Sequence, residues 1–460
     1  MIGDFKEIFG FVDLGIGFMY LIIILMLLAY KRSKTTDLEA RKYFNRMVAL
    51  KLGMSFIFVL MYIVYYKGGD NTAYWQGGVK LNMIFFDNPS AFFNNLTYFE
   101  ANSYDDLIVF QNVGNPPNYI FRGYESWFVC KVVSLVSFLT LRSYLATTLF
   151  FTYLTTMASW RLFTLINNYK VMSTRNAAIA TLFIPSVGIW CSGITKDALI
   201  YAAILYLITN IFSIFNGWKK LTLWTIIVMI ISGFIIYHLR SFIFYLVIVS
   251  VALGMLAGYQ KKFKDNFIFR IAYFLAIITG FVTLIFVFAS SNAVEAFNES
   301  SFMEEAEVVQ NDFIKNETYT GQRYDLGEVE FTVVGLLKVF PISVITSFYR
   351  PFILEARSPI LFANALESLI FVWFTLKFIF QGNVFRKIRM ILANEALSFA
   401  LYFAVFLGFI VGFTSILFGV LVRFRAPLLP FLAIILLAGI SYAVQKKSNE
   451  EVETQNNPSI

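Results

Sequence analysis

The sequence has little charge. Asp, Glu, Lys and Arg make up 14% of its 460 residues, whereas hydrophobic residues make up 58%. Because soluble domains carry about 25% charged residues, this composition excludes an ordinary soluble protein. Apolar runs of about 20 residues recur along the chain, which is typical of membrane-spanning helices, and the short alternating segments of a transmembrane barrel are lacking. We therefore predict an all-α, polytopic integral membrane helical bundle with about 11 transmembrane helices.

Histidine and cysteine are also scarce, with one His and two Cys in the chain. This set is too small for the usual His and Cys zinc sites. The phosphate-binding P-loop, the glycine-rich dinucleotide loop and the Ser-His-Asp motif are absent too. We therefore expect no cofactor and no metal site, and nothing in the sequence indicates a divalent metal. The net charge of +8 matches the basic cytoplasmic loops of a membrane protein, so nucleic acid is not an expected partner.

The distribution of basic residues predicts the orientation of the chain. The strongest basic block begins at Lys31-Arg-Ser-Lys34 and continues to Lys51. Loops rich in lysine and arginine stay in the cytoplasm, so the N-terminus is expected outside and the C-terminus inside. The apolar runs place the spans near residues 11–30, 52–66, 143–160, 176–190, 198–212, 221–237, 241–259, 271–290, 360–380, 396–420 and 428–444.

These spans are expected to form a single transmembrane domain over residues 1–446, followed by a disordered cytoplasmic tail over 447–460. Two long external loops, 67–126 and 291–335, should carry short helices on the membrane surface. The apolar stretch 127–141 is short and contains a lysine. We interpret this stretch as a surface or re-entrant helix, because a full span there would place the next basic residues outside.

Ionisable residues gather at the predicted external ends of the spans. Basic residues on that side run against the usual charge bias. A single one of them could simply reach the lipid headgroups, but several together favour a shared anionic ligand. Arginine and lysine both bind phosphate, and at the mouth of a helical bundle a lipid phosphate or pyrophosphate fits best. The residues are Asp70, Lys196, Asp197, His238, Arg240, Arg350, Glu355, Arg423 and Arg425.

The first candidate motif is Gly68-Gly-Asp-Asn-Thr-Ala-Tyr-Trp75, directly after the second span. The Asp70 carboxylate could act as a base toward a hydroxyl group, while the Tyr74 ring holds a sugar. The alternative is an ordinary Gly-Gly-Asp-Asn turn with aromatic residues at the membrane interface.

The second candidate motif is Trp190-Cys-Ser-Gly-Ile-Thr-Lys-Asp197, which separates two apolar runs. Ionisable residues at membrane depth indicate a functional site. The alternative is a polar turn in which Asp197 caps the next helix. His238 has two interpretations as well, either a proton shuttle or phosphate contact, or an aromatic residue at the interface.

These motifs resemble elements of bacterial membrane glycosyltransferases. Gly69-Asp70 with Tyr74 is similar to the catalytic loop of the GT-C superfamily and of EpsG-like polymerases. Trp190 to Asp197 resembles a motif of predicted polymerases, and Arg423-Phe-Arg425-x-Pro427 is similar to the external arginines of O-antigen polymerases of the Wzy type. The chain departs from the GT-C pattern because it has no Asp-x-Asp or Glu-x-Asp pair after the first span, which puts a metal-assisted mechanism in doubt.

The resemblance implies a GT-C-like fold and a multi-pass polysaccharide polymerase in the bacterial inner membrane. Its donor and acceptor would be undecaprenyl-linked glycans at the outer face, and membrane lipids and a chain-length regulator are the implied partners. Asp70 would be the base or would position the acceptor, and Asp197 would orient Lys196. Lys196 and the four arginines would neutralise the departing phosphate. Glu355 would pair with Arg350 or Arg357, or act as a second acid or base.

Two alternatives remain open. A GT-C transferase could add a single sugar from a lipid-phosphate donor, and product length would distinguish it from a polymerase. A transporter or flippase of an anionic lipid-linked glycan would also use external arginines. Such a protein is expected to show repeated halves with broken helices, and we find no convincing internal repeat.

Overall fold

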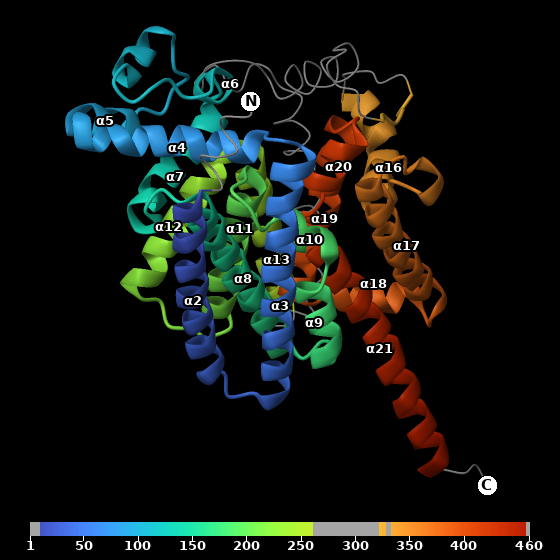
Figure 1. Cartoon of the computed structure of the whole chain (residues 1–460). Coiled ribbons are helices and arrows are strands. Elements are labelled where there is room, and N and C mark those ends of the chain that lie inside the picture. The colour runs from blue at the N-terminus through green and yellow to red at the C-terminus, as the bar shows by residue number, and fades with distance from the viewer. Residues whose placement is uncertain (1–9, 261–321, 328–332, 457–460) are drawn as a thin grey trace. The chain divides into compact units, whose positions relative to one another are not determined.

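The structure is a computed structural model that describes residues 10–260, 322–327 and 333–456. Within these ranges the chain is helical, and the only β-type pairing is an isolated bridge between Arg323 and Leu417 (Figure 1). This confirms the all-α prediction. The predicted span at 271–290 and most of the loop at 291–335 lie outside the described residues.

Seven described helices are long and apolar enough to cross a membrane, so the chain is a polytopic helical membrane protein. The predicted number, about 11, is not reached among the described residues, partly because several predicted spans are short or bent helices. The seven are Phe11–Ser33, Leu38–Tyr65, Lys196–Phe215, Ser241–Tyr259, Pro359–Phe380, Glu395–Thr414 and Leu429–Lys446.

The chain divides into two compact units, whereas hydropathy alone treated residues 1–446 as one domain. Unit 1 contains Met1–Leu162 and Val187–Phe242, and unit 2 contains Phe163–Ser186 and Ile243–Ile460. The helices wholly or mainly in unit 1 are α2 (Phe11–Ser33), α3 (Leu38–Leu60), the π-helical turn η1 (Met61–Tyr65), α4 (Asp70–Asp87), α5 (Pro89–Thr97), the 3-10 helix η2 (Asp105–Phe110), α6 (Asn118–Arg122), α7 (Tyr124–Thr140), α8 (Tyr144–Tyr169), α10 (Pro185–Trp190), α11 (Lys196–Phe215) and α12 (Leu223–Leu239).

The helices of unit 2 are α9 (Thr174–Leu182), α13 (Ser241–Gln260), α16 (Val333–Tyr349), the 3-10 turn η3 (Ile353–Glu355), α17 (Pro359–Phe380), α18 (Val384–Leu392), α19 (Glu395–Thr414), α20 (Phe418–Phe424) and α21 (Leu429–Asn456). Within this unit, 89% of the residues in the apolar part of α19 and 72% of those in the apolar part of α21 are buried. For α17 the share is only 33%. The exposed apolar surface of α17 is what a lipid-facing helix requires.

The turn between α2 and α3 is shorter than the sequence suggested. The predicted second span, 52–66, is the end of a helix that already begins at Leu38. Asp37 starts this helix because its carboxylate accepts hydrogen bonds from the backbone N–H groups of Glu39 and Ala40, at 2.9 and 3.2 Å. Several basic residues of the predicted loop therefore lie on the first turns of α3.

The external loop 67–126 contains short helices, as expected, and begins with the longer helix α4. This helix lies crosswise to α2 and α3 (Figure 1) and packs on α7. The contact needs glycine, because a Cβ atom at Gly78 would lie 2.4 Å from Cγ1 of Val133. Helix α7 in turn meets α8 at an angle of 108°. The segment 127–141 is thus a separate helix that does not continue the next span, in agreement with a surface or re-entrant helix.

The predicted span at 176–190 is wrong as a single helix. The chain there forms α9 and α10, separated by a break before Pro185. Proline lacks the backbone N–H that would continue a helix, and it also disfavours helical geometry in the residue before it. The short helices that result cannot each cross a bilayer.

Two glycines on α19 allow α16 to approach closely. Gly408 and Gly412 are one helical turn apart, and a Cβ atom at Gly412 would lie 1.9 Å from the backbone oxygen of Ser343. Such Gly-x-x-x-Gly spacing is typical of helix pairs in membranes, where small residues let backbones meet. This contact was not predicted from the sequence.

Helix α21 also departs from expectation. It continues to Asn456, although the sequence led us to expect a disordered tail over 447–460. Lys447, three glutamates and Gln455 in the added turns are good helix formers and favour extension of the helix beyond the apolar stretch.

Candidate functional site

The turn before α11 is buried in unit 1 and held by hydroxyl groups. The backbone oxygen of Ser192 accepts hydrogen bonds from Thr152 Oγ1 on α8, at 2.7 Å, and from Ser55 Oγ on α3, at 3.4 Å. The two hydroxyls also bond to each other at 2.8 Å. Gly193 packs against the ring of Phe58 so closely that a Cβ atom there would lie 1.9 Å from a ring carbon. The motif therefore has one well-defined backbone path.

Replacing Gly193 with alanine should destabilise unit 1. The added methyl group must displace the buried Phe58 ring, and overpacking of this kind costs about 1–3 kcal/mol. The control is Gly53→Ala on α3, because a Cβ atom at Gly53 meets nothing within 4 Å. The measurement is the thermal unfolding midpoint of each purified variant in detergent. Equal midpoints for both variants would contradict the tight packing of the turn.

The turn ends in a helix start that presents two ionisable residues. Thr195 is the N-cap of α11, and its hydroxyl accepts a hydrogen bond from the backbone N–H of Ala198 at 3.0 Å. This corrects the alternative in which Asp197 is the cap. Lys196 and Asp197 lie in the first turn, where the helix dipole favours the carboxylate.

Each of these residues has a partner of opposite charge from another helix. Lys196 Nζ lies 2.8 Å from Glu125 Oε2 on α7, and Asp197 Oδ1 lies 3.8 Å from Arg240 Nη2 after α12. We had expected Asp197 to orient Lys196, but Glu125 holds that lysine instead. The Asp197 side chain is 3% exposed, whereas that of Glu125 is 45% exposed. The Lys196–Glu125 pair is therefore the part of this site that a ligand can reach more easily.

His238 lies in an aromatic setting beside these pairs. Its ring stacks on Phe99 and Phe128, with centroids 4.8 and 5.4 Å away, and its Nδ1 forms a hydrogen bond with the Tyr124 hydroxyl. Tyr124 is the neighbour of Glu125 in the chain. The stacking fits the interpretation as an interfacial aromatic residue, and the bond to Tyr124 also leaves a route for proton exchange.

Asp70 belongs to α4, the helix that packs on α7. It is the half-buried first residue of α4 and follows Gly69, whose positive φ of 124° suits glycine. Partial burial and the nearby Asp70 carboxylate raise the pKa of Tyr119. Helix α7 is thus contacted by α4, which begins at Asp70, and its Glu125 pairs with Lys196.

Tyr74 does not have the role we expected. Its side chain is 2% exposed and packs inside unit 1, so its ring is not presented to a sugar. The reason is its position on α4, one helical turn after Asp70, on the side that contacts α7.

The remaining predicted residues form a second cluster in unit 2. Arg350, directly after α16, contacts Glu355 through Nε, at 2.9 and 3.2 Å from the two carboxylate oxygens. The guanidinium group also lies 5.2 Å from the ring centroid of Tyr324 and 5.4 Å from that of Phe418. Of the two arginines expected as partners of Glu355, Arg350 forms the pair, and the aromatic rings fix this arginine further.

Arg425 is buried completely, which contradicts its role as a surface phosphate contact. Its guanidinium donates hydrogen bonds to the backbone oxygens of Arg350 and Asn364 and to Ser368 Oγ. Burial lowers its pKa to about 10, and the Glu367 carboxylate opposes the shift, so Arg425 stays charged at neutral pH. It ties α17 to the turn after α16. Arg423, two residues earlier, is half-buried.

The sequence-predicted residues therefore fall into two groups. Asp70, Lys196, Asp197, His238 and Arg240 belong to unit 1, and the three remaining arginines with Glu355 belong to unit 2. Glu125, Tyr119 and Tyr124 were not predicted as site residues, because they lie in the part of the external loop without a motif. Their only sequence signal is that Tyr124 and Glu125 directly precede the apolar stretch 127–141.

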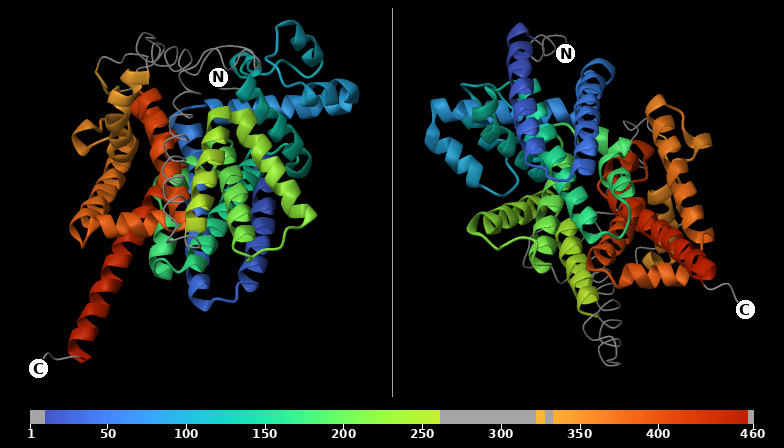
Figure 2. Two further views of the ribbon diagram at one scale, coloured as in Figure 1. Left: turned by 180° about the vertical axis from the view of Figure 1, so that it is seen from behind. Right: turned by 90° about the horizontal axis from the view of Figure 1, so that it is seen from below.

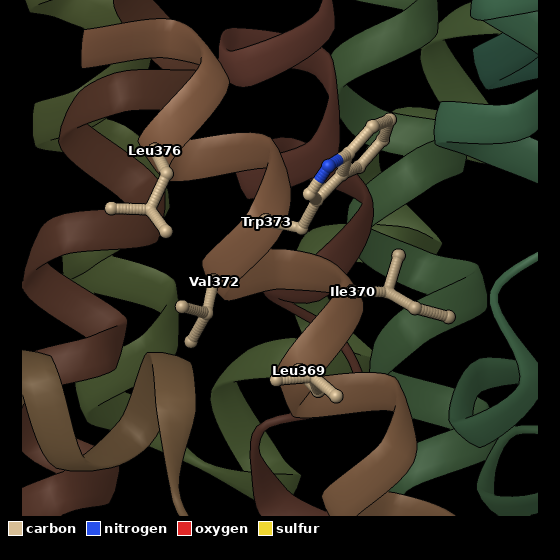
Figure 3. A pocket seen from close by; sticks show the side chains of 5 residues that line it. All are labelled: Leu369, Ile370, Val372, Trp373 and Leu376. Carbon is tan, nitrogen blue, oxygen red and sulfur yellow. The ribbon is translucent and has the colours of Figure 1, made fainter. Parts of the chain in front are cut away.

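An apolar hollow of about 440 Å³ lies elsewhere, along α17 of unit 2 (Figure 3). It is lined by Leu369, Ile370, Val372, Trp373 and Leu376. All five come from one face of one helix, and none is ionisable. This hollow fits acyl chains and has no chemistry for a reaction.

Among the described residues, no group of three His, Cys, Asp or Glu side chains could hold a metal ion. Comparison of the chain with protein-family models, with curated proteins and with solved structures finds no match.

Proposed function

We propose that the protein is a membrane glycosyltransferase of the polysaccharide-polymerase kind. It would use sugars linked to undecaprenyl phosphate or pyrophosphate, at the outer face of a bacterial inner membrane. The observation that carries the proposal is the Lys196–Glu125 ion pair on α7, together with Asp70 at the start of α4, the helix that packs on α7. These residues combine a base for a hydroxyl group with a cation for a phosphate.

The position of these residues within unit 1 supports the proposal. The turn between α2 and α3 is basic, and from the usual charge bias we infer that it is at the cytoplasmic end of this unit. Helix α3 runs from that turn to α4 at the other end (Figure 1). Because α4 packs on α7, which holds Glu125, the ion pairs belong to the end away from the basic turn. Lipid-linked sugars exposed on the outer leaflet would meet this end.

In the proposed reaction, Asp70 accepts the proton of an acceptor hydroxyl as the oxygen attacks the anomeric carbon of the donor sugar. The bond between that carbon and the phosphate oxygen breaks, and the lipid phosphate leaves with the electron pair. Lys196 stabilises the negative charge that develops on the leaving phosphate. Arg240 adds positive charge nearby and also balances the buried Asp197 carboxylate.

The test is transfer by the purified protein in proteoliposomes, with lipid-linked glycan extracted from its source membranes as the substrate. A ladder of products supports polymerisation, whereas a single added mass supports the alternative of single-sugar transfer. Release of unchanged glycan into the vesicle lumen, with no new product, would contradict both and support a transporter.

Lys196→Gln should slow this transfer by about 10- to 100-fold, because a neutral amide stabilises a leaving phosphate less well than an ammonium group. The matched control is Lys220→Gln, which removes an exposed lysine beyond the opposite end of α11. Initial rates at saturating donor report the effect. A rate for Lys196→Gln equal to that of the control would contradict the role of Lys196. The proposed function itself is tested separately, by the transfer activity of the wild-type protein.

A further inference from the structure

Helix α18 of unit 2 has an exposed face with apolar side chains on one side and arginines on the adjacent side. It lies crosswise to α17, as Figures 1 and 2 show, and connects α17 to α19. Its sequence, Val384-Phe-Arg-Lys-Ile-Arg-Met-Ile-Leu392, contains no acidic residue. A short crosswise helix between two membrane spans lies where the spans leave the bilayer.

The inner face of α18 is fixed to the rest of unit 2. Lys387 is 1% exposed, and its ammonium group donates hydrogen bonds to the backbone oxygens of Phe378 and Gln381 at the end of α17. Ile391 is also buried, and α18 packs against α19 and α21. These contacts leave the helix no freedom to turn its other face inward.

The outer face exposes large apolar side chains next to arginines. Phe385 is 81% exposed and Ile388 is 39% exposed. Arg386 and Arg389 are exposed as well. At 100° per residue, Phe385 and Ile388 lie on one side of this face, and the two arginines lie on the adjacent side. Exposure of Phe385 to water is unfavourable, and burial of the two arginines among acyl chains alone is unfavourable as well.

The end of α17 carries the marks of a membrane boundary. Lys377 Nζ lies 4.8 Å from the ring centroid of the exposed Trp373, and such Trp and Lys pairs are typical of the interface. Phe380, at the last position of α17, is 79% exposed. The exposed apolar surface thus continues from α17 through Phe380 to Phe385 on α18.

We propose that α18 is an interfacial anchor that binds anionic phospholipids. The Phe385 and Ile388 side chains enter the acyl region of the leaflet that borders this end of unit 2, while Arg386 and Arg389 bind the phosphate groups. Charge complementarity selects a lipid surface with a net negative charge, since Glu395, the nearest carboxylate in the sequence, is buried at the start of α19. This inference does not depend on the proposed glycosyl transfer.

The experiment uses the full-length protein in nanodiscs made of phosphatidylglycerol and phosphatidylcholine in equal amounts. After transfer to detergent, native mass spectrometry gives the ratio of the two lipids that stay bound. The double variant Arg386→Gln/Arg389→Gln should lower the phosphatidylglycerol ratio by about fivefold or more. Phe385→Ser should reduce the total bound lipid without changing this ratio.

The matched control is Lys31→Gln/Lys34→Gln, which removes two exposed lysines at the end of α2 in unit 1. It should keep the wild-type lipid ratio. An equal fall of this ratio in both double variants would show that the loss of any two positive charges has the same effect, which would overturn the proposal. An unchanged ratio in the Arg386 and Arg389 variant would also overturn it and would assign the face to an acidic protein instead. Equal thermal unfolding midpoints establish that the variants are folded.

Discussion

Asp70→Asn should lower the rate of glycosyl transfer by about 10²- to 10⁴-fold, the usual contribution of a general base. The amide cannot accept the proton of the acceptor hydroxyl, although it fits the same space. Asp70 is the first residue of α4, so the loss of its charge should cost at most about 1 kcal/mol of stability through the helix dipole. The variant should therefore be folded and inactive.

The measurement is the initial rate of product formation in proteoliposomes at saturating donor and acceptor. Asp105→Asn is the matched control, because it makes the same chemical change at an exposed position of the same external loop. The control should keep the wild-type rate. Normal rates for Asp70→Asn would exclude this residue as the base. They would not contradict the proposed function itself, which the activity of the wild-type protein tests.

Gly412→Ala should have the largest effect on stability. The new Cβ atom would lie 1.9 Å from the backbone oxygen of Ser343 and 2.7 Å from its carbonyl carbon. A side chain can rotate away from such a contact, but the backbone of α16 can relieve it only if the whole helix moves. We expect a loss of about 3 kcal/mol, at the upper end for overpacking.

Size-exclusion chromatography after heating, monitored at several temperatures, gives the midpoint at which each variant aggregates. Gly419→Ala on α20 is the control, because a Cβ atom at that position meets nothing within 4 Å. Its midpoint should equal that of the wild type. If Gly412→Ala shares that midpoint, then α16 and α19 do not meet as closely as the structure has them.

The sequence predicted the helical class because low charge and long apolar runs leave few other structures in a bilayer. Local signals explain part of what it missed. The cap at Asp37, the break at Pro185 and the spacing of Gly408 and Gly412 are all visible in the sequence. Hydropathy averages over such single residues, so it placed the span ends incorrectly and overlooked the α16–α19 contact.

The partners of the site residues could not be predicted in the same way. Lys196 and Glu125 are 71 positions apart, and no local pattern connects them. Asp197 seemed a natural neighbour of Lys196 in the chain, but consecutive residues on a helix point in different directions. Arg425 looked accessible because it precedes a predicted span, whereas its burial depends on carbonyl groups supplied by α17 and the turn after α16.

The carboxylate partners of Lys196, Arg240 and Arg350 bear on competition from the anions of the surrounding solution. A chloride ion that approaches one of these cations must replace a carboxylate of equal charge, so it gains little. A diphosphate carries several charges and can contact a cation while the carboxylate stays nearby. Under the proposed function, each neutralised cation would therefore favour a diphosphate over small monovalent anions.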